Sequence, residues 1–130
     1  MYPQEIMPNV YWGFYGGKYR TLEAFIEEVK RYNEDFGIRW NPDETVFEGA
    51  ALTVQFAYWD EEDDEETEED FDLHADKGAF TAGELLFKIH NHVVEKLEDD
   101  DRHFFEGLTL WEGEDYANSK TPLYFLNQGS

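Results

Sequence analysis

Residues 60–70 constrain the fold most strongly, because ten of these eleven positions are Asp or Glu. Carboxylate side chains are almost never fully buried without partners, so this run has to lie at the surface. It separates residues 46–59, which are dense in β-branched and aromatic residues, from a segment that begins at Phe71 and has Phe71 and Leu73 on one parity. We therefore predict a hairpin of two strands in which residues 60–70 form a long acidic loop.

Two segments have the apolar spacing of amphipathic helices. Thr21 is a suitable N-cap residue, and the apolar residues that recur after it at three- and four-residue steps predict a helix over residues 21–35. Thr81 and Glu84 match a capping box, and the apolar residues that follow predict a second helix that ends near Glu98.

Four further segments are candidates for short strands, namely residues 10–15, 38–40, 104–111 and 123–127. With the short candidate at residues 38–40 left out, the predicted order is β-α-β-β-α-β-β, which has too few helices for a doubly wound parallel sheet. The chain has 130 residues, of which 41% are hydrophobic, enough for one core. We predict a single α+β domain over residues 1–130, with two main helices packed on one face of a mostly antiparallel sheet.

The whole chain is acidic, with 31 acidic residues against 10 basic residues and a net charge of −21. A field of this sign repels nucleic acid and anionic membranes and attracts basic partners. We therefore expect no binding to nucleic acid or to membranes. Because the chain has no cysteine and its first residues lack the pattern of a signal peptide, we expect a cytoplasmic protein. The sequence leaves the oligomeric state open.

The acidic run does not fit a calcium-binding EF-hand loop. With Asp60 as the first position, Glu65 occupies the sixth position, where a glycine is required for the sharp turn. Phe71 occupies the twelfth position, where a bidentate Glu is required. We predict no dedicated metal site in this run.

The remaining polar residues give no catalytic motif. His90 and His92 lie two positions apart on the second predicted helix, so their side chains point in different directions and cannot ligate one ion. We interpret His90 as a histidine at the edge of the core. There is no cysteine nucleophile, and neither Ser119 nor Ser130 lies in a nucleophile motif. We predict no enzymatic activity and no cofactor.

Recognition of a partner is the function that these observations favour. Tyr58 and Trp59 adjoin the acidic run, and Trp111 adjoins a second acidic stretch, so aromatic anchors stand among carboxylates that suit a basic protein. The alternative is that the run only keeps the protein soluble. The predicted partner-binding residues are Tyr58, Trp59, Asp60, Glu61, Glu62, Asp63, Asp64, Glu65, Glu66, Trp111, Glu112, Glu114 and Asp115.

Residues 80–113, FTAGELLFKIHNHVVEKLEDDDRHFFEGLTLWEG, and the segment PLYFLNQGS, residues 122–130, resemble the immunity proteins of bacterial polymorphic toxin and contact-dependent inhibition systems. Such proteins are small, acidic α+β domains without a catalytic motif. The resemblance implies an inhibitor that binds a toxin domain, such as a nuclease, and masks its active site. It is a resemblance to a class, and it assigns no residue a role.

Two other functions stay open. A protein of this charge could imitate DNA and inhibit enzymes that bind nucleic acid, and such a mimic would space its carboxylates regularly along an elongated surface. A metal-assisted enzyme would require His92 and Glu95 to converge in one pocket with His74 or His103.

Overall fold

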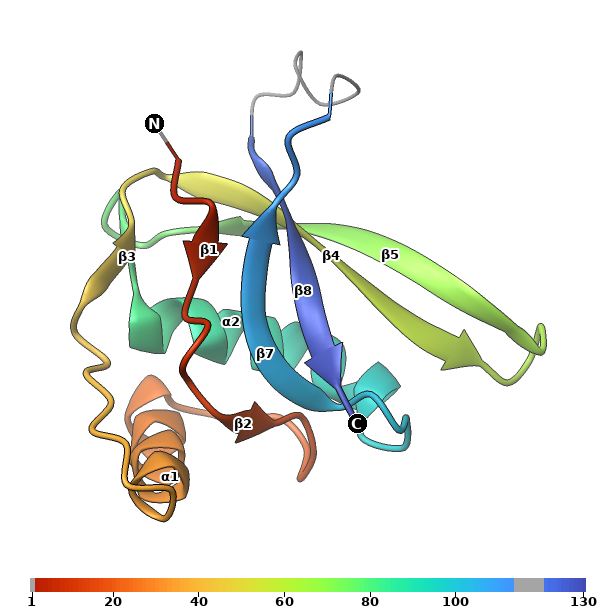
Figure 1. Ribbon diagram of the computed structural model, residues 1–130, viewed down its shortest axis with the longest axis horizontal. Helices are drawn as coiled ribbons and strands as arrows, with labels where there is room; N and C mark the ends of the chain where they lie inside the picture. Colours follow the sequence, from red (N-terminus) through yellow and green to blue (C-terminus); the bar gives the residue numbers. More distant parts are fainter. Residues whose placement is uncertain (1, 114–120) are drawn as a thin grey trace.

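The computed structural model describes residues 2–113 and 121–130, which contain two helices and eight strands (Figure 1). The helices are α1 (Leu22–Glu34) and α2 (Ala82–Leu97). The strands are β1 (Glu5–Ile6), β2 (Trp12–Gly13), β3 (Thr45–Phe47), β4 (Ala51–Asp60), β5 (Glu65–His74), β6 (Phe80–Thr81), β7 (Phe104–Leu110) and β8 (Leu123–Gly129).

The main sheet has the strand order β1-β7-β8-β4-β5, and β2 also pairs with β7. Its pairs are antiparallel except for β4 and β8, which are parallel and place Thr53 beside Leu123. Strands β3 and β6 form a separate antiparallel pair. Helix α2 runs behind the sheet in Figure 1, and α1 packs against α2 and β2. The predicted α+β class, with two helices and a mostly antiparallel sheet, is confirmed.

Both helices begin where their capping residues predict. The Thr21 hydroxyl accepts a hydrogen bond from the backbone N–H of Ala24, and the Thr81 hydroxyl accepts one from that of Glu84. The second half of the capping box is not formed at α2. The Glu84 carboxylate instead accepts hydrogen bonds from the backbone N–H of Asp76 and from Lys88 Nζ. It thus ties the first turn of α2 to the segment that precedes β6.

The predicted hairpin is confirmed, but the long acidic loop over residues 60–70 is wrong. The turn covers only residues 61–64, and the acidic residues from Glu65 to Asp70 form the first half of β5. They pair in register with β4, from Asp60 opposite Glu65 to Gln55 opposite Asp70. Since β5 is the edge strand, its carboxylates stay solvated while its backbone is paired, and a charged edge also resists pairing with other chains.

The core lies between α2 and the sheet and extends to α1. Leu86, Ile89 and Val93 of α2 are fully buried, as are Leu52 and Val54 of β4. The segment over residues 38–40, which we predicted as a strand, is not one. Trp40 is nevertheless buried, at 8% exposure.

Candidate acidic groove

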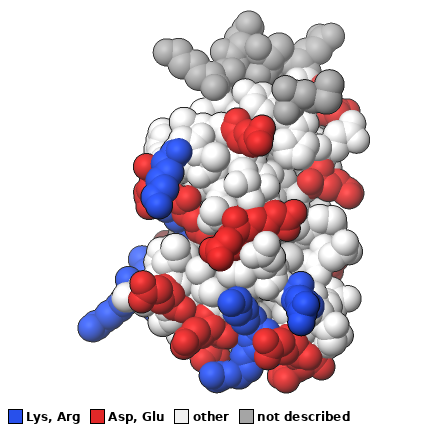
Figure 2. All heavy atoms as spheres, turned by 90° about the vertical axis from the view of Figure 1, so that its left-hand side faces the viewer, with Lys and Arg blue, Asp and Glu red and all other residues white. Residues whose placement is uncertain are grey.

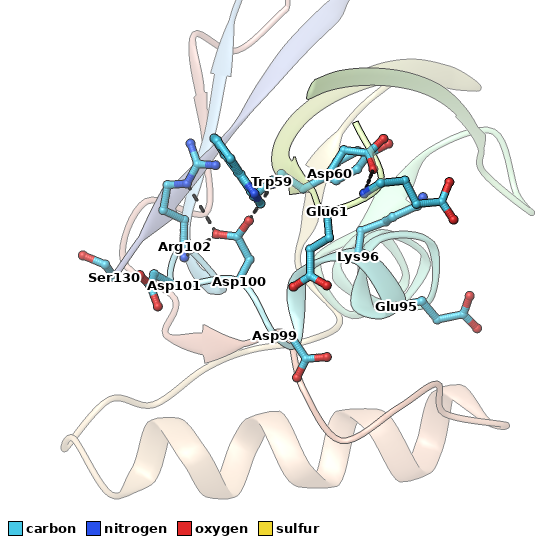
Figure 3. Close-up of a pocket in the computed structure, with 12 residues that line it drawn as sticks. Trp59, Asp60, Glu61, Glu95, Lys96, Asp99, Asp100, Asp101, Arg102 and Ser130 are labelled. Carbon is cyan, nitrogen blue, oxygen red and sulfur yellow. Dashed lines mark hydrogen bonds and ion pairs between the residues drawn. The ribbon is translucent and has the colours of Figure 1, made fainter. Parts of the chain in front are cut away.

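An open groove of about 850 Å³ lies where the β4–β5 turn faces the C-terminal end of α2 (Figure 3). Of its twelve lining residues, seven are Asp or Glu and two are Lys or Arg. They come from the end of β4 and its turn, from the last turn of α2 and from the segment after it. The lining residues are Tyr58, Trp59, Asp60, Glu61, Glu62, Glu95, Lys96, Asp99, Asp100, Asp101, Arg102 and Ser130.

The C-terminal end of α2 contributes the charges that a helix end favours least. The last carbonyl groups of a helix carry partial negative charge, so cations are favourable there and carboxylates are unfavourable. The last turn of α2 offers one cation, Lys96, whereas acids fill every position from Glu98 to Asp101. This arrangement costs local stability, and it concentrates negative potential at one side of the groove.

Trp59 and Tyr58 were both predicted as partner contacts, and the structure separates them. Successive residues of a strand point to opposite faces, so Tyr58 faces the core and Trp59 faces outward. Tyr58 is 7% exposed, stacks on Phe56 and lies under Lys96 Nζ, which is 4.8 Å from its ring centre. Trp59 is 51% exposed. Trp59 is therefore the accessible aromatic side chain of this pair, whereas Tyr58 lines the groove but is packed mainly in the core.

The acidic turn is built on Asp60. Its Oδ1 accepts hydrogen bonds from the backbone N–H of Glu62 at 2.9 Å and of Asp63 at 3.4 Å, which closes the turn. The side chains of Glu61, Glu62, Asp63, Asp64 and Glu65 are exposed and form no hydrogen bond or ion pair within the described residues. These five carboxylates are available to a partner.

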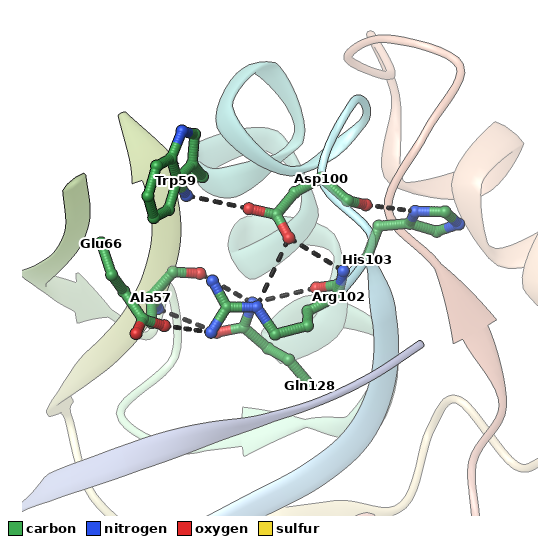
Figure 4. A network of polar contacts seen from close by, with 7 residues as sticks. All are labelled: Ala57, Trp59, Glu66, Asp100, Arg102, His103 and Gln128. Atoms are coloured by element: carbon green, nitrogen blue, oxygen red, sulfur yellow. Dashed lines mark hydrogen bonds and ion pairs between the residues drawn. The ribbon is translucent and has the colours of Figure 1, made fainter. Parts of the chain in front are cut away.

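Asp100 differs from the other acids of the groove because its side chain is only 7% exposed and its carboxylate is hydrogen bonded to two backbone N–H groups (Figure 4). Its carboxylate accepts hydrogen bonds from the backbone N–H of Trp59 and of Arg102, both at 2.9 Å, and its backbone carbonyl accepts one from His103 Nδ1 at 2.7 Å. Burial raises the pKa of the Asp100 carboxyl, but the hydrogen bonds from these two N–H groups, together with the charge and side-chain hydrogen bond of Arg102, outweigh it and hold the pKa below its usual range.

Arg102 lines the groove, and Gln128 lies outside the lining and is hydrogen bonded to the backbone of Arg102. The Arg102 guanidinium donates to Glu66, and Gln128 forms hydrogen bonds with the backbone N–H and C=O of Ala57 and with the backbone C=O of Arg102 (Figure 4). Glu66, predicted as a partner contact, is therefore occupied within the protein. Sequence analysis missed Asp100, Arg102 and Gln128, and no spacing in the sequence indicates that they meet.

The second predicted group, around Trp111, lies at the opposite end of β4. The backbone N–H of Trp111 donates to the carbonyl of Leu123, which pairs with Thr53, whereas Trp59 lies six residues farther along β4. At 3.3 Å per residue this separation is roughly 20 Å. Trp111 is 38% exposed and packs edge-on against Phe125.

Of the three acids in this second group, Glu112 lies within the described residues. Glu112 is exposed, and its Oε1 accepts a hydrogen bond from Gln4 Nε2 at 2.9 Å. Glu114 and Asp115 lie outside the described residues. The structure therefore does not bring the two predicted groups into one site.

The histidines do not share a site either. His92 Nε2 lies 3.2 Å from the Glu69 carboxylate and its ring stacks on Phe71 at 3.7 Å, whereas Glu95 pairs with Lys18. Within residues 2–113 and 121–130, no three His, Cys, Asp or Glu side chains are grouped so that they could hold a metal ion.

His90 is fully buried rather than at the edge of the core. Its Nδ1 accepts a hydrogen bond from Trp12 Nε1 at 3.0 Å, and its Nε2 lies 2.8 Å from the carbonyl of Gly17. Both ring nitrogens are therefore satisfied, and His90 has a structural role.

No family model matches this chain, and neither a curated protein nor a solved structure matches it. Across the described ranges, neither helix has the length and apolar character needed to cross a membrane.

Proposed function

We propose that this protein is an acidic protein-binding module that acts as an immunity or inhibitor protein, neutralising a toxin by masking its active site. The observation that carries the proposal is the exposed Trp59 side chain at the rim of a groove where seven acidic residues face two basic ones. A partner with a basic cleft, such as a nuclease toxin, has the complementary charge.

The groove supplies the two parts that a protein interface needs. Trp59 offers a large ring that a partner can bury and that can receive an Arg or Lys side chain on its face. The unpaired carboxylates from Glu61 to Asp64 attract a basic partner and orient it. Asp100 holds the backbone of Trp59 in place, so the anchor is presented from a rigid strand end.

DNA mimicry is the second candidate, and the position of the acidic run in β5 favours it. Glu66, Glu68, Asp70 and Asp72 alternate along β5 on the face away from the core, so they recur about every 6.6 Å. Three of these four carboxylates bind groups of the protein, namely Arg102, Gln55 and Thr53. Because a mimic needs its carboxylates free, we rank this function second.

The experiment is capture of the partner from a lysate of the source organism with the tagged protein as bait. The column is washed at low salt and then at about 0.5 M salt, where the Debye length is about 4 Å and weak charge contacts are screened. We expect one stoichiometric basic protein to survive the second wash with the wild-type bait and to be lost with Trp59→Ala. Trp111→Ala is the matched control, since it removes the exposed tryptophan at the far end of β4.

The captured protein is then expressed in a bacterial host with and without the bait. Toxicity that the wild-type protein suppresses and Trp59→Ala does not would support the immunity function. Capture of several DNA-binding enzymes that are released together by added DNA would support the mimic instead. If every protein is removed by the salt wash, the proposal fails.

A further inference from the structure

A second groove, of about 460 Å³, lies between β1 and β3, at the end of the molecule opposite the β4–β5 turn. Its apolar lining includes Ile6, Met7, Val10, Trp40 and Val46. A hollow of this size and composition is within the range of binding sites. Two strand edges with unpaired backbone groups border this groove, and one buried lining side chain has a hydrogen-bond donor without an acceptor.

Strand β1 exposes an unpaired backbone edge to this groove. The backbone N–H of Leu110 in β7 donates to the carbonyl of Gln4, and antiparallel ladders alternate residues that bond to the partner strand with residues that face away. The backbone N–H and C=O of Glu5 therefore point away from β7. Within the described residues they have no other hydrogen-bond partner.

Strand β3 presents a second unpaired edge. The backbone N–H of Ala82 donates to the carbonyl of Glu44, and Thr45 lies opposite Thr81 in the β3–β6 pair. By the same alternation, the backbone N–H and C=O of Thr45 point away from β6. Both Glu5 and Thr45 line the groove, so two free strand edges border one hollow.

Trp40 has a buried hydrogen-bond donor without an acceptor. Its side chain is 8% exposed and lines the groove, and its Nε1 is the one buried side-chain nitrogen or oxygen in the described residues that has no hydrogen-bond partner. Trp12 provides a contrast, because its Nε1 donates to His90. A buried donor without an acceptor is costly and uncommon in native proteins, so an acceptor from outside the described chain is expected at Trp40.

Charge favours an occupant that carries some positive charge. Glu5 and Glu44 line the groove against one cation, Arg39. Figure 2 faces the β3 side of the molecule and shows Lys and Arg side chains interspersed with Asp and Glu, most of them in its lower part, with further Asp and Glu on the largely uncharged surface above. This side is therefore less uniformly acidic than the groove at Trp59, and its groove suits a peptide with apolar and basic residues.

We propose that the groove between β1 and β3 binds an extended segment of a partner protein, which adds a strand to the free edges at Glu5 and Thr45. Alternate apolar side chains of the segment face Ile6 and Val46, and one of its carbonyl groups accepts the hydrogen bond of Trp40 Nε1. The indole N–H is closed to solvent in the free protein, so binding includes a small movement of a side chain at the rim. This inference is independent of the acidic groove.

The test uses the 130-residue chain and a synthetic hexapeptide, Ac-Lys-Val-Lys-Val-Lys-Val-NH2. Its control, Ac-Lys-Pro-Lys-Pro-Lys-Pro-NH2, has the same charge but no N–H at alternate positions, so it cannot pair with both edges. Binding is followed by two-dimensional NMR of backbone amides and of the tryptophan indole N–H groups. We expect the valine peptide alone to shift the amides of Glu5 and Thr45 and to move the Trp40 indole signal to lower field.

The variant Trp40→Phe keeps an aromatic ring and removes the donor. We expect it to bind the valine peptide at least about fivefold more weakly, while its unfolding midpoint in urea stays the same or rises. Trp111→Phe should bind as the wild type does. Equal binding of both peptides, shifts confined to the acidic groove, absence of binding, or unchanged affinity of Trp40→Phe would each overturn the proposal.

Discussion

The middle of helix α2 and the segment beyond its C-terminal end differ in how many hydrogen-bond partners their polar side chains have. In the middle of the helix, His90 is buried among aromatic rings and both of its nitrogens are hydrogen bonded, to Trp12 and to the carbonyl of Gly17. Beyond the C-terminal end, Asp99 and Asp101 are exposed or partly exposed and have no partner in the described residues. The first region stabilises the fold, whereas the second keeps its charges available at a cost in stability.

The hydrogen bonds at His90 also fix its protonation. An indole N–H can only donate, so Nδ1 of His90 has to be the acceptor and the proton has to lie on Nε2, which donates to Gly17. His90 is therefore neutral in the native state. Burial lowers the pKa of His90 below its ordinary value of 6.5, and the hydrogen bond to the Gly17 carbonyl opposes this only in part.

The largest effect that this comparison predicts is the loss of His90. His90→Ala removes a buried ring and leaves Trp12 Nε1 and the Gly17 carbonyl without partners, so we expect the free energy of unfolding to fall by about 4 kcal/mol. Urea denaturation measures this change. His92→Ala, on the same helix but 40% exposed at its side chain, should cost about 1 kcal/mol. Equal losses in the two variants would contradict the structural role of His90.

Asp100 combines features of both regions, because it lies in the acidic groove but its carboxylate is hydrogen bonded as in a protein core. Asp100→Ala leaves the backbone N–H groups of Trp59 and Arg102 without their charged acceptor, and we expect a loss of about 2–3 kcal/mol. Its neighbour Asp99 is the control, and Asp99→Ala should stay within about 0.5 kcal/mol of the wild type. Thermal unfolding of both variants checks the difference.

The pH dependence of stability should separate the two regions further. Because the folded pKa of His90 is lowered, the unfolded chain binds a proton at His90 that the native state does not bind. The contribution of neutral His90 to the free energy of unfolding is therefore complete above pH 6.5 and is lost as the pH falls below it. The advantage of the wild type over His90→Gln in unfolding free energy should therefore shrink between pH 7.5 and 5. The slope of this free-energy difference against pH should not exceed about 1.4 kcal/mol per pH unit, the value for one proton. A constant difference would mean that His90 does not titrate on unfolding.

The smallest expected effect concerns the charges at the end of α2. Neutralising Glu98 and Asp99, by Glu98→Gln and Asp99→Asn, removes carboxylates from the negative end of the helix dipole and should raise stability by about 0.5 kcal/mol each at low salt. The gain should disappear at about 0.5 M salt. Glu23→Gln, in the first turn of α1, is the opposite control and should lower stability. A gain that persists at high salt would point to a cause other than charge.

The sequence predicted those features that depend on neighbours along the chain. Thr21 and Thr81 give the starts of both helices, and alternation from Leu52 to Tyr58 gives the buried face of β4. The acidic run was misassigned because Asp and Glu have low strand propensity, which pairing with β4 overrides. In the groove, the acidic turn was predicted but its length was overestimated, whereas the contact of Trp59 with Asp100 joins residues with no sequence signal in common.

The place of β8 in the sheet has a consequence for how the chain folds. Strand β8 lies between β7 and β4, and its parallel pairing with β4 brings Leu123 beside Thr53. Until β8 is in place, the edges of β4 and β7 that it will join have no partner strand. The acids of β5 hinder pairing with other chains only at the outer edge of the β4–β5 hairpin. Closure over such long sequence separations is slow. Aggregation during refolding should therefore be governed by the rate at which β8 is inserted, and not by the charge of the native surface.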